Sequence, residues 1–309
     1  MSPKNLVIGS RGSPLAMWQA NWVKSQLLDL HEGLQVDIKI IKTSGDKIQD
    51  VPLAKIGGKG LFVMEIEEAL LRNEVDIAVH SMKDVPMDLP FGLSIAVVTE
   101  RENPFDALIS RNNLSLKDLP KGAKIGTGSL RRISQLLHHR PDFEIMPLRG
   151  NIDTRLKKLE TEGLDAIILA AAGLRRMGWG DRISEIIDSE IVLPAMGQGA
   201  VGIEARSYDT EVKSMLIGLD HEESFLALEA ERAFVGVLEG GCQVPIGCYA
   251  TLKDDELTIQ GRVASLDGKT LYQWERNGRH CDAKKIGQEL GRDILKMGAD
   301  KILQELLQH

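Results

Sequence analysis

Arginine and hydroxyl side chains gather around one glycine-rich turn of this 309-residue sequence. The turn is Gly126-Thr127-Gly128-Ser129, and Arg131 and Arg132 follow it. Free N–H groups at a helix N-terminus bind anions, and the planar fork of arginine matches a carboxylate or a phosphate. Arg131 stands where a dinucleotide-binding fingerprint has its third glycine, so that fingerprint is excluded. We predict a small-anion site here, although a simply capped helix start has the same local pattern.

Polar side chains also follow three other predicted strands. They are Arg11 and Ser13 after a strand at 6–9, Lys83 and Asp84 after a strand at 76–80, and Arg149 and Arg155 after a strand at 144–146. In open α/β sheets, ligands bind beyond the carboxyl ends of the strands. The four strand ends together predict one type of site, a cradle for an anionic ligand.

Asp84 differs from the other strand-end residues because it is a carboxylate beside a lysine. Basic neighbours keep such a carboxylate ionised, and it can then stabilise a nearby cation. The structural alternative is a hydrogen bond from the local backbone at a turn, which aspartate often accepts.

Cysteine and histidine usage indicates neither a disulfide scaffold nor a metal site. The sequence has three cysteines and seven histidines, with no paired-cysteine motif and no metal-ligand spacing. Cys242 follows two glycines, and a proline comes three residues later, which places the thiol on an accessible loop. A lone cysteine is commonly an inert small hydrophobe, and we interpret Cys248 and Cys281 in this way. His80 ends an apolar strand and is predicted to be a partnered core residue.

Charge is distributed unevenly along the chain. The net charge of −7 and the aromatic share of 4% argue against a protein that coats nucleic acid or membranes. Residues 124–158 nevertheless carry eight basic and three acidic side chains, whereas residues 204–232 carry eight acidic and three basic ones. A charge run is commonly a solvated helix face. Because arginines predominate in the basic segment and lie beside glycine turns, we predict a site for a small polyanion.

Nothing in the sequence indicates export or membrane insertion. The apolar residues 6–8 are followed by Arg11, which comes too early for a signal-peptide core. The longest apolar run, at 166–174, is about half of the ~18 residues that a membrane span requires. We therefore expect a cytoplasmic protein whose thiols stay reduced.

Alternating strands and helices must position these side chains. Strands are predicted at 6–9, 36–41, 76–80, 93–98, 124–126, 144–146 and 166–170, helices at 14–30, 61–72, from 129, 151–159 and after 170, and a long loop at 42–60. Ser13 with Pro14 marks the start of the first helix. This alternation predicts mainly parallel sheets that are covered on both faces. The C-terminal third is predicted as an α+β module with helices at 222–237 and 283–307 and strands at 249–260 and 262–266.

Several of these segments together resemble the porphobilinogen deaminase family, also called hydroxymethylbilane synthases. The matching segments lie at 11–16, 43–46, 55–62, 80–86, 126–132, 148–155, 193–199 and 239–247. They cover essentially the whole chain, and the set in this order is specific although no single member is.

The resemblance implies an α/β fold with two lobes like those of periplasmic binding proteins, each with a mainly parallel central sheet, and a smaller α+β C-terminal domain. The implied domains are 1–99 with 200–217, 100–199, and 218–309. The last of these carries a covalently attached dipyrromethane cofactor. The implied activity is that of a transferase that condenses four porphobilinogen molecules head to tail on this primer. Ammonia leaves at each step, and hydrolysis frees the linear tetrapyrrole hydroxymethylbilane for haem biosynthesis.

The resemblance also implies roles for individual residues. Asp84 is the implied catalytic carboxylate, and Cys242 is the implied thioether attachment point. The residues implied to bind the cofactor are Cys242, Lys83, Asp84, Ser129, Arg131 and Arg132. Those implied to bind the substrate are Arg11, Ser13, Thr127, Arg149, Arg155 and Arg176. Lys55, Lys59 and Phe62 are implied to belong to a loop that covers the cleft as a lid.

One position departs from the family pattern. The family often has a hydroxyl residue where Gly128 stands. The glycine removes a side-chain contact but keeps its backbone N–H for an anion, so Gly128 is left out of the ligand set.

The residues alone leave two other classes of function open. A non-catalytic two-lobed protein for a small polycarboxylate would explain the lobes but not the third domain. A nucleic-acid binder would use the basic segment but conflicts with the net charge. The resemblance implies porphobilinogen and a downstream tetrapyrrole-cyclising enzyme as partners, and a monomeric state by family precedent. Neither nucleic acid nor a membrane is expected as a partner.

Overall fold

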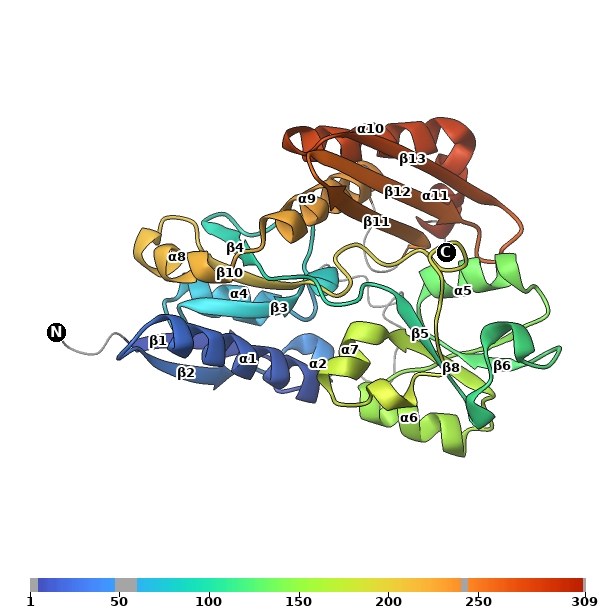
Figure 1. The fold of residues 1–309 in the computed structure, drawn as a ribbon, viewed down its shortest axis with the longest axis horizontal. Helices are drawn as coiled ribbons and strands as arrows, with labels where there is room; N and C mark the ends of the chain where they lie inside the picture. Colours follow the sequence, from blue (N-terminus) through green and yellow to red (C-terminus); the bar gives the residue numbers. More distant parts are fainter. Residues whose placement is uncertain (1–4, 48–59, 240–243, 308–309) are drawn as a thin grey trace. The chain divides into compact units, whose positions relative to one another are not determined.

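The computed structural model describes residues 5–47, 60–239 and 244–307 (Figure 1). The chain divides into two compact units. The first unit comprises the chain up to Glu102 together with Ala200–Phe225. The second comprises Asn103–Gly199 and the chain from Leu226 onward. None of the helices in the described ranges combines the length and apolar character needed to cross a membrane.

The first unit is built on a five-stranded sheet with the order β2-β1-β3-β10-β4. Its elements are β1 (Asn5–Ser10), α1 (Pro14–Leu30), β2 (Gln35–Ile40), α2 (Ser44–Lys47), α4 (Met64–Leu71), β3 (Ile77–Ser81), the 3-10 turn η1 (Met82–Asp84), β4 (Leu93–Val98), β10 (Val201–Arg206), α8 (Thr210–Leu216) and η5 (Ile217–Leu219). β1 is parallel to β2 and β3, whereas β10 is antiparallel to both of its neighbours. Four strands therefore point in one direction and β10 in the other.

Helices cover both faces of this sheet, as the alternating strands and helices predict. Leu6 and Ile8 of β1 pack with α1 and α8, and Val7 packs on the opposite face with α4. Because both faces are buried at the centre of the sheet, β1 and β3 are nearly continuous apolar runs.

The second unit repeats this design with the strand order β7-β6-β8-β5-β9. Its α/β elements are β5 (Asp106–Ser110), η2 (Arg111–Asn113), η3 (Leu116–Asp118), β6 (Lys124–Gly126), α5 (Leu130–His139), β7 (Glu144–Met146), α6 (Ile152–Thr161), β8 (Ala166–Ala170), α7 (Ala171–Arg176), η4 (Gly180–Arg182) and β9 (Glu185–Ile186). Here β5 is the reversed strand, between β8 and β9. α5 packs on one face of the sheet, and α6 and α7 pack on the other. The prediction of two mainly parallel α/β layers is confirmed.

The second unit also contains a smaller antiparallel sheet, β11-β12-β13, with helices against it. The elements of this module are α9 (Glu222–Val237), which starts in the first unit, β11 (Ile246–Lys253), β12 (Glu256–Ala264), β13 (Leu271–Arg279), η6 (His280–Asp282), α10 (Ala283–Ile294), the π-helical turn η7 (Leu295–Ala299) and α11 (Asp300–Leu307). Arg262 of β12 donates to Gln135 of α5 at 2.7 Å and so ties the module to the second α/β sheet. The expected α+β module is confirmed.

The strand boundaries in this module correct the prediction. The predicted strand at 249–260 contains the turn between β11 and β12, where Asp254 has φ 54°. The predicted boundary between 260 and 262 does not exist, because β12 runs through Gly261. β13 is absent from the prediction, since its polar and half-exposed side chains lack the expected apolar pattern. The predicted helix at 283–307 is interrupted at η7, where Gly298 has φ 111°.

Candidate functional site

The first unit brings four of the predicted site residues to one edge of its sheet. β1 and β3 are parallel neighbours, so the residues that follow them leave the sheet at the same edge. Arg11 and Ser13 follow β1, and Lys83 and Asp84 lie in η1 directly after β3. Ser13 caps α1 as predicted, with its Oγ accepting a hydrogen bond from Ala16 N at 3.4 Å.

A buried methionine fixes the turn that carries Lys83 and Asp84. Met82 is fully buried, and its backbone N–H donates to Ala200 O at 3.0 Å. Its sulfur occupies the space above Gly202 of β10, where an added Cβ would lie 2.0 Å from Sδ. The Asp84 side chain is half-buried, and no hydrogen bond reaches its carboxylate from the described residues. That carboxylate is therefore available to a ligand.

The guanidinium group of Arg11 is bound by Asp46 along one edge, and the Phe62 ring lies against one of its faces. Its Nη2 donates to Oδ1 of Asp46 at 2.5 Å, and its Nε donates to the same oxygen at 3.2 Å. Its guanidinium carbon lies 4.2 Å from the centre of the Phe62 ring. Burial raises the pKa of Asp46, but hydrogen bonds from Arg11 and Thr43 and the arginine charge outweigh burial and lower it overall.

The second unit has a matching edge, where β6, β7 and β8 end side by side in parallel. Thr127 and Ser129 follow β6, and the Ser129 N–H donates to the Thr127 hydroxyl at 3.3 Å. Arg149 follows β7 and is half-buried. Two further predicted residues bind neighbouring carbonyls, Arg155 through Nε to Gly150 O at 2.7 Å and Arg176 through Nη2 to Gly199 O at 2.8 Å.

Arg131 and Arg132 share one buried carboxylate. Asp106 is fully buried and accepts from Arg131 Nη1 at 2.7 Å and from Arg132 Nη2 at 2.7 Å. Arg132 also donates to Ile168 O, and Arg131 to Leu193 O. Burial raises the pKa of Asp106, but the two guanidinium charges and their hydrogen bonds hold it far below the usual range.

The fold explains how Asp106 reaches these arginines. β5 runs in reverse, so its first residue, Asp106, pairs with Ala170 at the carboxyl end of β8. This is the same sheet edge from which α5 starts with Arg131 and Arg132.

One donor of this cluster is left over. Nε of Arg131 is buried and has no hydrogen-bond partner among the residues that the structure describes. A buried donor without a partner is costly, since its desolvation is not repaid. Two guanidinium groups against one carboxylate also leave a net positive charge. Both features favour an anionic ligand at this edge.

Gly128 lies against the backbone of a neighbouring segment, so a side chain at this position would have no open space. A Cβ at this position would lie 2.9 Å from the carbonyl oxygen of Leu148. Gly128, where the sequence departs from the family pattern, therefore lies where the segments that follow β6 and β7 approach each other closely.

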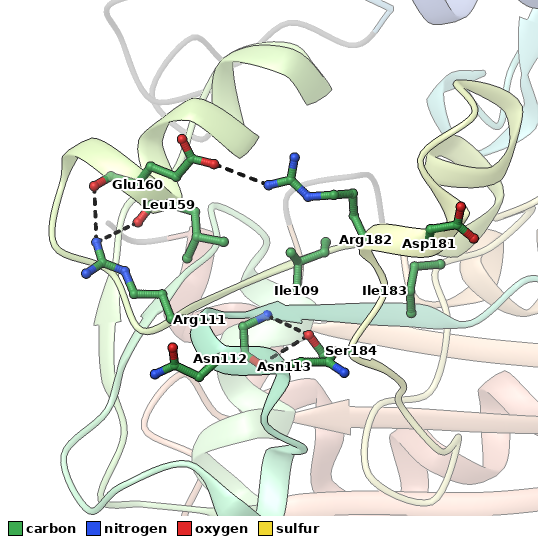
Figure 2. A pocket seen from close by; sticks show the side chains of 11 residues that line it. Ile109, Arg111, Asn112, Asn113, Leu159, Glu160, Asp181, Arg182, Ile183 and Ser184 are labelled. Carbon is green, nitrogen blue, oxygen red and sulfur yellow. Dashed lines mark hydrogen bonds and ion pairs between the residues drawn. The ribbon is translucent and has the colours of Figure 1, made fainter.

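The described residues also line a cavity of about 600 Å³, at the opposite edge of the second sheet (Figure 2). It lies where β5 ends and β8 begins, since Ser110 pairs with Ala166. Arg111 donates to Leu159 O at 2.9 Å, and Arg182 pairs with Glu160 at 3.3 Å. The cavity contains none of the predicted site residues.

The prediction for His80 is confirmed. It is buried, and its Nε2 lies 3.0 Å from Oε2 of Glu204, which is fully buried. Glu67 of α4 belongs to the same cluster. Burial and the charge of Glu204 raise the pKa of Glu67 to about 7, although His80 opposes them.

Some predictions fall on residues that the structure does not describe. Cys242, Lys55 and Lys59 lie outside the described residues. Cys248 is buried, whereas Cys281 is exposed. Within the described ranges, no group of histidine, cysteine, aspartate or glutamate side chains has the arrangement to hold a metal ion.

Two residues of the site were not predicted from the residues as functional. Asp46 lies in a segment that matches the family pattern, but nothing in its neighbourhood indicates a bond to Arg11. Asp106 has no local signal, because its partners lie 25 and 26 residues away.

Comparisons with known proteins identify similar chains. The family described as "Porphobilinogen deaminase, dipyromethane cofactor binding domain" matches residues 6–214, and "Porphobilinogen deaminase, C-terminal domain" matches residues 225–296. A porphobilinogen deaminase from Geotalea uraniireducens is 53% identical over 308 residues, covering 100% of this chain and 96% of the relative. One from Syntrophobacter fumaroxidans is 52% identical and covers 99% of both chains. Among solved structures, the probable amino-acid ABC transporter extracellular-binding protein ytmK from Bacillus subtilis is 13% identical, with 70% of this chain and 90% of that chain covered and a TM-score of 0.45.

Proposed function

Since the chain belongs to the porphobilinogen deaminase family, we propose that Asp84 is its catalytic carboxylate and that the basic residues at the two sheet edges bind substrate and cofactor carboxylates. The enzyme condenses four porphobilinogen molecules head to tail on a dipyrromethane primer. Each addition releases ammonia, and hydrolysis frees hydroxymethylbilane. The alternative of a non-catalytic binding protein is not favoured, because the matched family is an enzyme family with a cofactor domain.

The chemistry of the substrate explains the basic residues. Each pyrrole ring carries an acetate and a propionate, so carboxylates accumulate as the chain grows. An otherwise acidic protein needs a local concentration of guanidinium groups to hold them. We assign the substrate carboxylates to Arg11, Arg149, Arg155 and Arg176, with hydrogen bonds from Ser13 and Thr127.

One feature of the second unit suits a carboxylate of the dipyrromethane cofactor. The unpartnered Nε of Arg131 is a buried donor that a carboxylate would satisfy. We propose that Lys83, Asp84, Ser129, Arg131 and Arg132 hold the cofactor and that Cys242 attaches it by a thioether. The bound group supplies the primer on which the tetrapyrrole is built.

Asp84 can act on charge that develops during the reaction. A positioned carboxylate accepts hydrogen bonds from pyrrole N–H groups and stabilises the cation that forms when ammonia leaves the substrate. The same group can assist the proton transfers of the condensation. The observation that carries this assignment is a half-buried carboxylate with no hydrogen-bond partner among the described residues, next to Lys83 at the edge that also carries Arg11.

We also propose that the protein works as a cytoplasmic monomer and passes its product to a tetrapyrrole-cyclising enzyme. Its three proposed domains are 1–99 with 200–217, 100–199, and 218–309. The match of one family model to 6–214 and of another to 225–296 supports a separate C-terminal domain.

Two measurements test the proposal. Asp84→Ala should keep the fold and lose porphobilinogen turnover, whereas Asp88→Ala, at an exposed aspartate nearby, should keep turnover. Near-normal activity of Asp84→Ala would remove Asp84 from catalysis. The intact mass of the protein should exceed its sequence mass by two linked pyrrole units, and Cys242→Ser should abolish the excess. Fully active protein at its sequence mass would contradict the thioether.

A further inference from the structure

Arg11 has two edges that can each bind a carboxylate, and Asp46 occupies only one of them. A guanidinium group has five N–H donors arranged as two bidentate forks. Asp46 binds the Nε/Nη2 fork, at 3.2 Å and 2.5 Å. No hydrogen bond from Nη1 reaches a partner in the described part of the chain. The Nη1/Nη2 fork is therefore open to a second carboxylate.

Asp46 is itself held in place. Its Oδ2 accepts from the Thr43 hydroxyl at 2.8 Å and from the Thr43 N–H at 3.4 Å. Thr43 is fully buried, so these donors are fixed to the core of the unit. Phe62 lies against the guanidinium face and limits its rotation further.

This arrangement differs from an ordinary surface ion pair. A free arginine side chain has many rotamers, and binding a ligand would require it to lose most of them. The bonds from Thr43 to Asp46 and from Asp46 to Arg11 impose that order before any ligand binds. Preorganisation of this kind raises affinity without any contact of its own to the ligand.

We propose that Asp46 is a positioning residue that fixes Arg11 with its outer fork open to a carboxylate of porphobilinogen. The proposal rests on the substrate-binding role proposed above for Arg11. Asp46 does not touch the substrate, and it sets affinity through Arg11. Two other roles are conceivable for Asp46: it could only stabilise the turn at Thr43, or it could compete with the substrate for Arg11.

Glu65 provides a matched control. Its carboxylate accepts from the Ser44 N–H at 2.7 Å and from the Ser44 hydroxyl at 2.6 Å. It thus stabilises the same turn as Asp46 but makes no bond to Arg11. Asp46→Asn and Glu65→Gln each remove one charge from this turn, and only the first releases Arg11.

The experiment measures kcat and KM for porphobilinogen on holoenzyme, with the cofactor confirmed by intact mass. We expect Asp46→Asn to raise KM about tenfold with kcat within about twofold, because a released Arg11 must be ordered by the substrate. Glu65→Gln should leave KM unchanged, and Asp46→Glu should restore part of the affinity. Arg11→Ala should raise KM at least as much, and the Arg11→Ala, Asp46→Asn double variant should add nothing further.

The other outcomes separate the alternatives. A lower KM in Asp46→Asn would mean competition, and equal effects of Asp46→Asn and Glu65→Gln would mean that Asp46 only stabilises the turn. Either result overturns the positioning role while leaving the role of Arg11 intact. An unchanged KM in Arg11→Ala would instead overturn both. If Asp46→Asn does not yield holoenzyme, Thr43→Val makes the same test, with a KM rise of about twofold to threefold expected.

Discussion

Arg131 donates to Asp106 through Nη1 at 2.7 Å, and both side chains are buried. Arg132 uses the same carboxylate, so the pair of arginines keeps one net positive charge inside the protein. Asp106 therefore holds two guanidinium groups in place without neutralising them. A buried basic cluster of this kind is prepared for an anion, because part of its desolvation cost is already offset.

The first prediction concerns this shared carboxylate. Asp106→Asn leaves two buried guanidinium groups without a counter-charge, and we expect a loss of about 3–5 kcal/mol in the free energy of unfolding. The lowered pKa of Asp106 sets the sign of the pH dependence. Its stabilising contribution is present above the pKa of the unfolded carboxyl and is lost as the pH falls through the lower folded value. Urea denaturation at neutral and acidic pH measures both effects.

Asp142→Asn is the matched control for this prediction. Asp142 pairs with Arg140 at 2.8 Å, but both side chains are partly exposed, so the loss should be far smaller. Equal losses in the two variants would show that burial does not determine the strength of the Asp106 pair.

The second prediction concerns the unpartnered donor of Arg131. Arg131→Lys keeps the charge but removes Nε and the planar fork, so the variant should retain less cofactor. The measurement is the fraction of protein with the cofactor mass. Arg140→Lys, after the same helix α5, should retain the full mass. If Arg131→Lys retained as much cofactor as the parent protein, Nε of Arg131 would have no part in holding it.

The sequence predicts the positions of those site residues that directly follow a recognisable parallel strand. Arg11 and Asp84 follow apolar strands, and parallel strands bring such residues to one edge. Their internal partners could not be predicted. Asp46 lies 35 residues from Arg11, and Asp106 reaches Arg131 only because β5 runs against its neighbours. Nothing in a local sequence pattern specifies a reversed strand.

The fold was predictable to a similar degree. Apolar runs identified the strands that are buried on both faces, such as β3 and β8. β10 is just as buried, but Glu204 and Arg206 interrupt its apolar pattern. These two charged side chains can be buried because their partners come from distant segments of the chain, and a local pattern does not reveal such partners. β13 was missed for the opposite reason, since many of its side chains are exposed.

The third prediction concerns the packing of Met82 on Gly202. Gly202→Ala places a methyl group 2.0 Å from the Met82 sulfur, so the fully buried methionine must move. Lys83 and Asp84 follow Met82 directly in η1 and should move with it. Overpacking of this kind costs about 1–3 kcal/mol, and we expect turnover to fall at least tenfold, since small displacements of catalytic groups are costly.

Gly236→Ala, in helix α9, is the control for this effect. An added Cβ there meets no atom of the described residues within 4 Å, so turnover should not change. Thermal melting together with steady-state kinetics distinguishes displacement of the catalytic turn from general destabilisation. Normal turnover in Gly202→Ala would mean that the Met82 contact does not position Asp84.

The last prediction concerns Glu67, which lies buried in α4 near Glu204 and His80. Oε1 of Glu67 and Oε1 of Glu204 have no hydrogen-bond partner among the described residues, so a second negative charge here is poorly compensated. The folded-state pKa of Glu67 is raised to about 7 from an ordinary value of 4.5. Between these values the folded protein binds more protons than the unfolded chain, so stability falls as the pH rises through this window.

Glu67→Gln removes this titration and keeps a neutral side chain of the same shape. We expect the variant to gain about 2–3 kcal/mol relative to the parent protein between pH 4.5 and pH 8. Urea denaturation of both proteins across this range makes the measurement. Glu68→Gln is the control, because Glu68 is exposed and pairs with Arg72 on the surface of the same helix, so its pH profile should match the parent. If the free energy of unfolding of Glu67→Gln varied with pH in parallel with that of the parent protein, Glu67 would be ionised in the folded protein across the whole range. The nearby His80 would then compensate its charge.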